Sequence, residues 1–109
     1  MKIKKFLLIL TFSFLFNSQT TLADEAKMTK GLEIFNETAG CAACHVLKAA
    51  GSEGNIGPNL DTVEGISYES VMDIVTHGLG VMPAFGEDEI LTKEEIDVVS
   101  FYVANSVSK

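Results

Sequence analysis

Apolar residues recur at helical spacing in three stretches of the chain, and the first runs from Ala26 to Thr38. Leu32, Ile34 and Phe35 lie there among acidic residues, and Gly40 follows shortly afterwards. Glycine is common just past the end of a helix because it adopts left-handed backbone angles without strain. The pattern therefore predicts a short first helix that ends at Gly40.

A second helix is predicted from Tyr68 to His77, with Ser67 placed to cap its first turn and Gly78 to stop it. Its apolar stripe comprises Val71, Ile74 and Val75.

The last helix carries the best start signal in the chain. Thr92 and Glu95 have the spacing of a capping box, and Leu91 and Ile96 have that of a hydrophobic staple. Its buried face is expected to continue through Ile96, Val99 and Val103.

The segments between these helices read as loops. The stretch from Ala49 to Val63 is rich in glycine, with Pro58 and Asn59, and shows little periodicity. Since no segment alternates strictly between apolar and polar residues, the sequence predicts an all-α fold of three to four helices joined by long loops.

The length and composition of the chain indicate a leader segment followed by one domain. With 109 residues, 47% of them hydrophobic, two domains would not fit. A basic start at Met1 to Lys5, an apolar run from Phe6 to Phe16 and a small residue at Ala23 have the layout of a secretory signal. We therefore expect residues 1–23 to be a signal peptide and residues 24–109 the working domain. An uncleaved anchor is the weaker alternative, because spanning a bilayer takes roughly 20 apolar residues.

The working domain is strongly acidic. Residues 24–109 contain five lysines, no arginine and 15 acids, a formal charge of −10. Phosphate binding needs a basic face, so no nucleic-acid partner is expected. The charge fits partners with basic docking patches, and it equally fits simple solubility.

Candidate chemistry lies at Cys41-Ala42-Ala43-Cys44-His45, the C-x-x-C-H pattern of covalent haem c attachment. Two intervening residues put both sulfurs on one turn, where they can add to the two vinyl groups at one edge of a porphyrin. The next residue, His45, can then bring its imidazole to the iron.

Three other uses of the cysteines remain open. A thioredoxin-like dithiol would need a strand-to-helix turn that the sequence does not offer. A zinc site from Cys41, Cys44 and His77 would lack a well-spaced fourth ligand. A disulfide across two residues would close a small strained loop and would leave His45 without a role.

The second axial position decides the function, because a protein ligand makes an electron carrier whereas an open site binds gases or peroxide. Met82 is the favoured ligand, since it lies in a glycine-rich loop and the following Pro83 restrains the backbone. His77 is the competitor. Met72 lies on the apolar stripe of a helix and is read as core filling.

Together these residues resemble a class I c-type cytochrome over most of the chain, from about Lys27 to Val107. The resemblance implies that Gly31 and Phe35 pack against an aromatic residue of the last helix, Tyr102. It also implies that the carbonyl of Pro58, in Gly57-Pro58-Asn59-Leu60, accepts a hydrogen bond from His45. The run from Met82 to Gly86 is especially similar to cytochrome c6 and related small bacterial carriers.

The resemblance implies one haem c per chain, attached through Cys41 and Cys44, with His45 and Met82 as axial ligands. The expected function is one-electron transport in the periplasm, or in the lumen of a thylakoid system, between a dehydrogenase or membrane complex and an oxidase or reductase. No enzymatic activity of its own and no stable membrane insertion are expected. The alternative function is the haem subunit of a periplasmic dehydrogenase, for example one oxidising sulfite or an alcohol.

Overall fold

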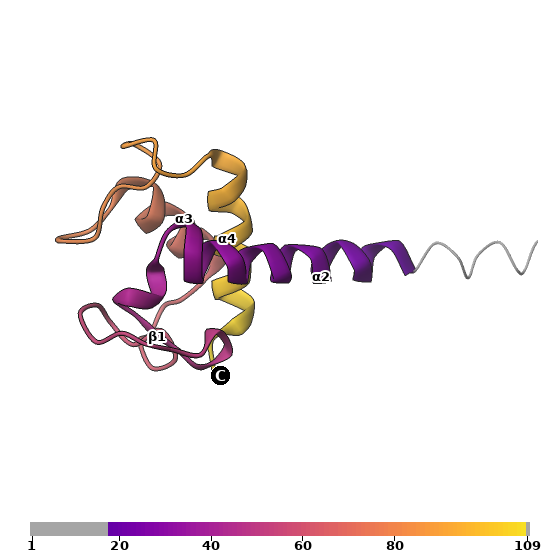
Figure 1. Ribbon diagram of the computed structural model, residues 1–109, viewed down its shortest axis with the longest axis horizontal. Coiled ribbons are helices and arrows are strands. Elements are labelled where there is room, and N and C mark those ends of the chain that lie inside the picture. Colours follow the sequence, from indigo (N-terminus) through magenta and orange to yellow (C-terminus); the bar gives the residue numbers. More distant parts are fainter. Residues whose placement is uncertain (1–17, 109) are drawn as a thin grey trace, which may run out of the picture.

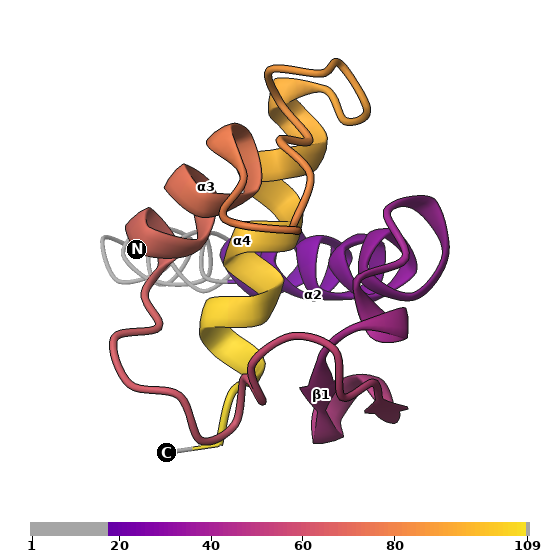
Figure 2. The same ribbon diagram turned by 90° about the vertical axis from the view of Figure 1, so that its left-hand side faces the viewer.

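Helix α4 (Lys93–Ser106) lies at the centre of the structure and packs against both α2 (Ser18–Glu33) and α3 (Tyr68–His77). The structure is a computed structural model that describes residues 18–108. Figure 1 and Figure 2 show α2 crossing α4, with α3 on the other side and the connecting loops gathered at one end. The predicted fold class is confirmed, because the structure is a small, mostly helical domain.

The crossing of α2 and α4 depends on Gly31. A Cβ atom added at Gly31 would lie 2.2 Å from Cβ of Tyr102, so only glycine lets the two helices approach this closely. One turn further along, the ring centroids of Phe35 and Tyr102 are 6.0 Å apart at an interplanar angle of 57°. The packing expected of Gly31, Phe35 and Tyr102 is thus confirmed.

The predicted starts of α3 and α4 are confirmed, and each is a reciprocal cap. Ser67 Oγ accepts from the backbone N–H of Ser70 at 3.1 Å, and Ser70 Oγ accepts from Ser67 N–H at 2.9 Å. At α4, Thr92 Oγ1 accepts from Glu95 N–H at 3.1 Å while Glu95 Oε1 accepts from Thr92 N–H at 3.0 Å. Gly78 ends α3 with φ of 75°, as the sequence predicts.

The first helix differs from its prediction at both ends. It begins at Ser18 rather than Ala26, and its α-helical part ends at Glu33, where the π-helical turn η1 (Ile34–Thr38) takes over. Gly40 then adopts φ of 69° and closes the segment, as expected. The predicted cleavage position after Ala23 falls within α2, and residues 1–17 of the predicted signal peptide lie outside the described residues.

A two-stranded antiparallel ladder was not predicted. β1 (Val46–Leu47) pairs with β2 (Ser52–Glu53) around the 3-10 turn η3 (Lys48–Ala50). Strands of two residues are too short to show alternation, which is why the pattern of apolar residues did not reveal them.

The core gathers residues from η1, β1, α3, α4 and the loops between them. It consists of Ile34, Phe35, Leu47, Val71, Val75, Phe85, Leu91, Ile96, Val99, Tyr102 and Val103. Two expected members are only half-buried: Leu32 packs at the edge of this core, and Ile74 faces the cavity described below. Among the described residues, no helix is long and apolar enough to cross a membrane.

Candidate functional site

The C-x-x-C-H motif folds into a tight turn directly after η1. Cys41–Ala43 form the 3-10 turn η2, and Cys41 O accepts from the N–H groups of Cys44 at 3.1 Å and His45 at 3.0 Å. Gly54 packs against the outer side of this turn, since a Cβ there would lie 2.7 Å from Ala42 O. The turn thus holds both cysteines and His45 close together, and the three residues form one wall of the cavity described below.

The orientation of His45 is set from the loop that follows β2. Its Nδ1 lies 2.7 Å from the carbonyl oxygen of Pro58. Because a carbonyl can only accept, Nδ1 carries the proton and Nε2 keeps its lone pair for a metal. Gly57 lies against the ring, where an added Cβ would come within 2.6 Å of His45 Cε1.

A cavity of about 530 Å³ opens beside this wall. The thiols of Cys41 and Cys44, the His45 ring and Met82 all belong to its lining, which is otherwise almost entirely apolar. Its apolar walls include Phe35, Leu60, Ile66, Val71, Ile74, Val75, Phe85, Val99 and Val103. Four of the predicted site residues are therefore brought to one cavity, and Pro58 lines it as well.

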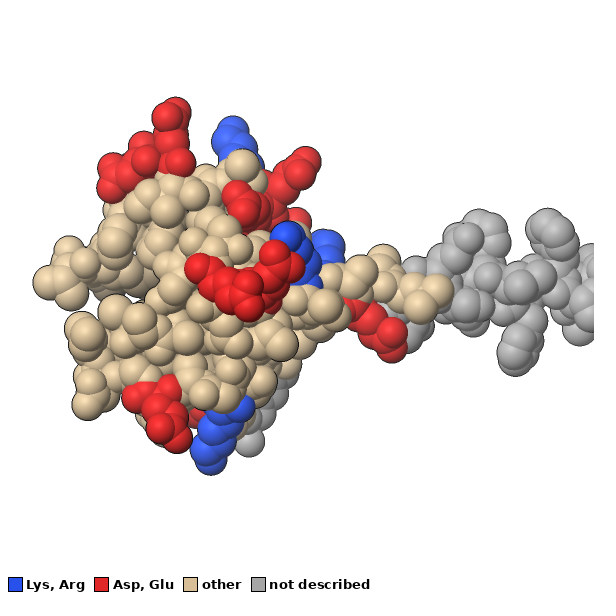
Figure 3. Space-filling view, viewed as in Figure 1, with Lys and Arg blue, Asp and Glu red and all other residues tan. Residues whose placement is uncertain are grey.

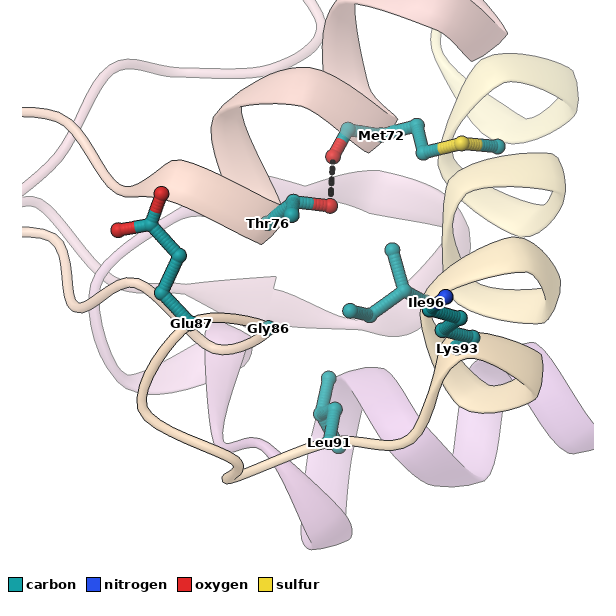
Figure 4. Close-up of a pocket in the computed structure, with 7 residues that line it drawn as sticks. All are labelled: Met72, Thr76, Gly86, Glu87, Leu91, Lys93 and Ile96. Carbon is teal, nitrogen blue, oxygen red and sulfur yellow. Dashed lines mark hydrogen bonds between the residues drawn. The ribbon is translucent and has the colours of Figure 1, made fainter.

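The loop after α3 supplies Met82. Leu79 and Met82 bond to each other through backbone N–H to oxygen distances of 3.2 and 3.0 Å, which folds the loop into a narrow hairpin. Gly78 lies under it, because a Cβ there would be 2.8 Å from Met82 O. Met82 is half-buried and faces the cavity, whereas Met72 lines a different hollow between α3 and α4 (Figure 4).

His77, the competing ligand, is not brought to the cavity. It ends α3 with an exposed side chain, and its Nδ1 lies 2.5 Å from Oε1 of Glu87. Its Nε2 lies 3.7 Å from Oδ1 of Asp73. Both ring nitrogens thus face carboxylates on the outer surface.

The other uses of the cysteines gain no support. Burial raises the pKa of the Cys41 thiol to about 11, whereas reactive dithiols depend on a lowered pKa. Within residues 18–108, no three Cys, His, Asp or Glu side chains cluster as a metal site, and His77 is absent from the cavity lining that holds Cys41 and Cys44.

Sequence reasoning missed several residues that shape the site, namely Ser52, Ile56, Val63 and Leu79. Ser52 is buried, and its Oγ accepts from Leu47 N–H at 2.9 Å and donates to His45 O at 2.8 Å. The mouth of the cavity carries exposed apolar side chains, namely Ile56, Val63, Leu79 and Val81. Of the Asp, Glu, Lys and Arg residues that the structure describes, only Glu64 lines the cavity.

Charged side chains keep to the flanks of the molecule. Figure 3 shows acidic groups above and below the loop end of the domain, while the lips of that end carry uncharged residues and enclose a hollow. The site therefore combines an apolar cavity and mouth with an acidic surround.

Haem c fits these residues. The volume lies within the range of about 300 to 1,000 Å³ typical of cofactor sites, and the donor set is two thiols, an imidazole with an available Nε2 and a thioether. A helical fold around such a cavity defines a small class I c-type cytochrome.

Comparison with known proteins agrees. Residues 26–103 match the family described as "Cytochrome C oxidase, cbb3-type, subunit III", and the chain belongs to this family of c-type cytochromes. It therefore carries haem c as its cofactor.

The chain is 32% identical to chloroplastic cytochrome c6 of Chlamydomonas reinhardtii, over 88% of this chain and 66% of that protein. It is also 32% identical to cytochrome c6 of Rippkaea orientalis, over 89% of this chain and 86% of the relative. The crystal structure of the c-type cytochrome SorU from Sinorhizobium meliloti is similar, with 45% identity and a TM-score of 0.69. That similarity covers 78% of this chain and 95% of SorU.

Proposed function

We propose that this protein is a periplasmic one-electron carrier in which Cys41 and Cys44 attach haem c and His45 and Met82 are its axial ligands. The observation that carries the proposal is the shared cavity, which the imidazole, the thioether and both thiols line together. The hydrogen bond from His45 to Pro58 supports it further, because the bond leaves Nε2 available to the iron.

Haem c supplies a reversible one-electron change of its iron. The residues of this chain would set the reduction potential of that change and keep water away from the haem. The Pro58 carbonyl makes the imidazole of His45 a better electron donor and fixes its plane, while a thioether ligand at Met82 raises the reduction potential. The apolar walls exclude water, so little has to move when an electron arrives.

The cysteines can be tested by attachment chemistry. Full-length protein is expressed in a bacterial host with a c-type maturation system, and haem is stained after denaturing electrophoresis. We expect stain on the wild-type polypeptide and none on the Cys41→Ser/Cys44→Ser double variant. Stain that persists in the double variant would contradict thioether attachment.

Export is proposed from the layout of residues 1–23, and it suits a protein whose haem is attached after translocation. Mass spectrometry of the haem-stained product tests it. Cleavage after Ala23 predicts a mature chain that begins at Asp24. A product retaining Met1 in the cytoplasmic fraction would contradict periplasmic location.

The proposed partners are redox proteins that dock briefly at the mouth of the cavity. Val81 is 92% exposed and Leu79 68%, which gives the mouth an apolar contact area. Transient electron-transfer contacts bury little area, and the acidic flanks suit partners with basic patches around their own redox site.

The same apolar mouth also suits a permanent neighbour, and the matched family is described as a subunit of an oxidase. The second candidate is therefore the haem subunit of a periplasmic dehydrogenase, for example one oxidising sulfite or an alcohol. Size-exclusion chromatography of periplasmic extract separates the two. A haem peak at the mass of one domain supports the carrier, and a haem peak bound to a larger subunit supports the alternative.

A further inference from the structure

We propose that His77 and Glu87 form a pH-dependent clamp that positions the loop bearing Met82, so that charge on the pair slows dissociation of the distal ligand. The inference rests on the proposed ligation by Met82. Neither residue touches the cavity, so both are positioning residues.

The clamp joins the two ends of the loop. Residues 78–86 leave the end of α3 and return beside it, where Thr76 O accepts from the N–H groups of Gly86 at 3.2 Å and Glu87 at 3.1 Å. Beside these backbone bonds, Nδ1 of His77 and Oε1 of Glu87 are 2.5 Å apart. Backbone and side-chain contacts therefore close the loop at one point.

The base of the loop packs closely against α3 and α4. A Cβ at Gly86 would lie 2.9 Å from Thr76 Cγ2 and 3.1 Å from Ile96 Cδ1. Figure 4 shows Gly86 facing the hollow between Thr76 and Ile96, with the carboxylate of Glu87 turned away from it. Gly86 allows the loop to pack closely against Thr76 and Ile96, and the outward carboxylate of Glu87 can contact His77.

The far end of the loop is held less firmly. Leu79, Gly80 and Val81 are exposed, and the described contacts across the tip are the two backbone bonds between Leu79 and Met82. Residues 79–81 are exposed, and Met82 packs only against the edge of the core, so its orientation also depends on how well the base of the loop is closed.

The pair responds to pH through His77. Charged groups that act on this ring are Glu87 from the loop and Asp73 from its own helix. The hydrogen bond to Glu87 is the main influence on His77 and raises its pKa. Desolvation lowers the pKa and the charges of Glu87 and Asp73 raise it, so that the pKa of His77 stays above its usual 6.5. The ion pair is thus present at lower pH and is lost as pH rises through that raised pKa.

The test is the rate of carbon monoxide binding to the reduced holoprotein, which is limited by dissociation of the distal ligand and uses a probe that is neutral at every pH. We compare wild type, H77Q, E87Q and the double variant at about pH 5.5 and about pH 9. Exposed ion pairs are individually weak, so each single substitution should speed binding about threefold at the lower pH. At the higher pH, E87Q and wild type should bind at the same rate.

Controls separate the clamp from general charge effects. E89Q removes the same charge two residues further along the chain and should leave the rate unchanged at both pH values. In the H77Q background, E87Q should add nothing, because the two side chains act as one unit. Equal acceleration by E87Q and E89Q, additive effects, or an E87Q effect independent of pH would overturn the clamp.

Failure of the proposed ligation would look different. Wild-type protein would then bind carbon monoxide without a dissociation-limited phase, and its ferric form would lack a sulfur-to-iron band. That result would remove the clamp together with Met82 ligation, whereas a normal wild-type spectrum with unchanged variant rates would remove the clamp alone.

Discussion

The Nδ1 atom of His45 donates to the carbonyl oxygen of Pro58 across 2.7 Å, although 13 residues separate them in sequence. This bond fixes both the tautomer and the plane of the ring. The backbone on either side supports it, since Gly57 N–H donates to Cys44 O at 2.8 Å and Leu60 N–H donates to Val46 O at 3.0 Å. The loop from Gly57 to Leu60 and the C-x-x-C-H turn therefore form one unit.

Gly57→Ala should disrupt that unit. The new Cβ would lie 2.6 Å from His45 Cε1, so the imidazole must tilt or the loop must shift. We expect a reduced fraction of low-spin haem in the absorption spectrum. Gly51→Ala is the control: it strains the backbone, with φ of 67°, but its Cβ meets no atom within 4 Å, so it should lose stability without changing the haem spectrum.

Gly31→Ala should destabilise the fold at the crossing of α2 and α4. A methyl group 2.2 Å from Cβ of Tyr102 forces the helices apart, and overpacking of this kind typically costs about 1 to 3 kcal/mol. Urea unfolding of the holoprotein measures the loss. Thr29→Ala, at an exposed position of the same helix, should change the free energy of unfolding by no more than about 0.5 kcal/mol. Equal losses in both variants would contradict the packing argument.

Asp61 should make stability sensitive to acid. Its carboxylate accepts from the N–H groups of Lys48 at 2.9 Å and Ser108 at 3.0 Å, which ties the η3 turn to the C-terminal end. The hydrogen bond from Lys48 N–H, with that from Ser108, lowers the pKa of Asp61 below 3.8. Its contribution is therefore present above pH 3.8 and is lost as pH falls through the lowered value.

Asp61→Asn should accordingly lower the urea midpoint near neutral pH and differ less from wild type at acid pH, where the Asp61 carboxylate becomes protonated. Glu53→Gln, an exposed acid of β2 with no described hydrogen bond or ion pair from its carboxylate, should match wild type at both pH values. A difference between Asp61→Asn and wild type that stays constant from neutral to acid pH would refute the linkage.

The acidic surround should set the salt dependence of electron exchange. Residues 24–109 carry a formal charge of −10, and the Debye length falls from about 30 Å at 0.01 M salt to about 10 Å at 0.1 M. Stopped-flow oxidation by a cationic cobalt or ruthenium complex should slow several-fold over this range, whereas oxidation by ferricyanide should accelerate. The same response to both reagents would show that the protein charge does not reach the electron-transfer site.

Local sequence signals predicted the starts of α3 and α4 and the end of α3 well because these ends are determined by adjacent residues. The capping side chains at Ser67 and Thr92 and the stops at Gly40 and Gly78 all act within one turn of the element they bound. The two-residue strands escaped prediction because their partner contacts are set by the buried Ser52, whose neighbours in sequence carry no strand pattern.

In the candidate site, too, local sequence signals predicted some residues, whereas contacts between distant segments went unpredicted. A fixed motif indicated Cys41, Cys44 and His45 as candidates, and a proline-restrained loop indicated Met82. The fit of Gly57 to the imidazole and the pairing of His77 with Glu87 depend on loops meeting across the fold. No local spacing encodes such contacts, so they emerge only from the three-dimensional arrangement.

The most direct test of His45/Met82 ligation is the absorption spectrum of the holoprotein in both oxidation states, measured for wild type and Met82→Ala. We predict a low-spin wild-type spectrum with a ferric sulfur-to-iron band. In Met82→Ala the haem should remain attached, the band should disappear, and the reduced form should bind carbon monoxide rapidly. An unchanged band and unchanged carbon monoxide binding in Met82→Ala would contradict the assignment.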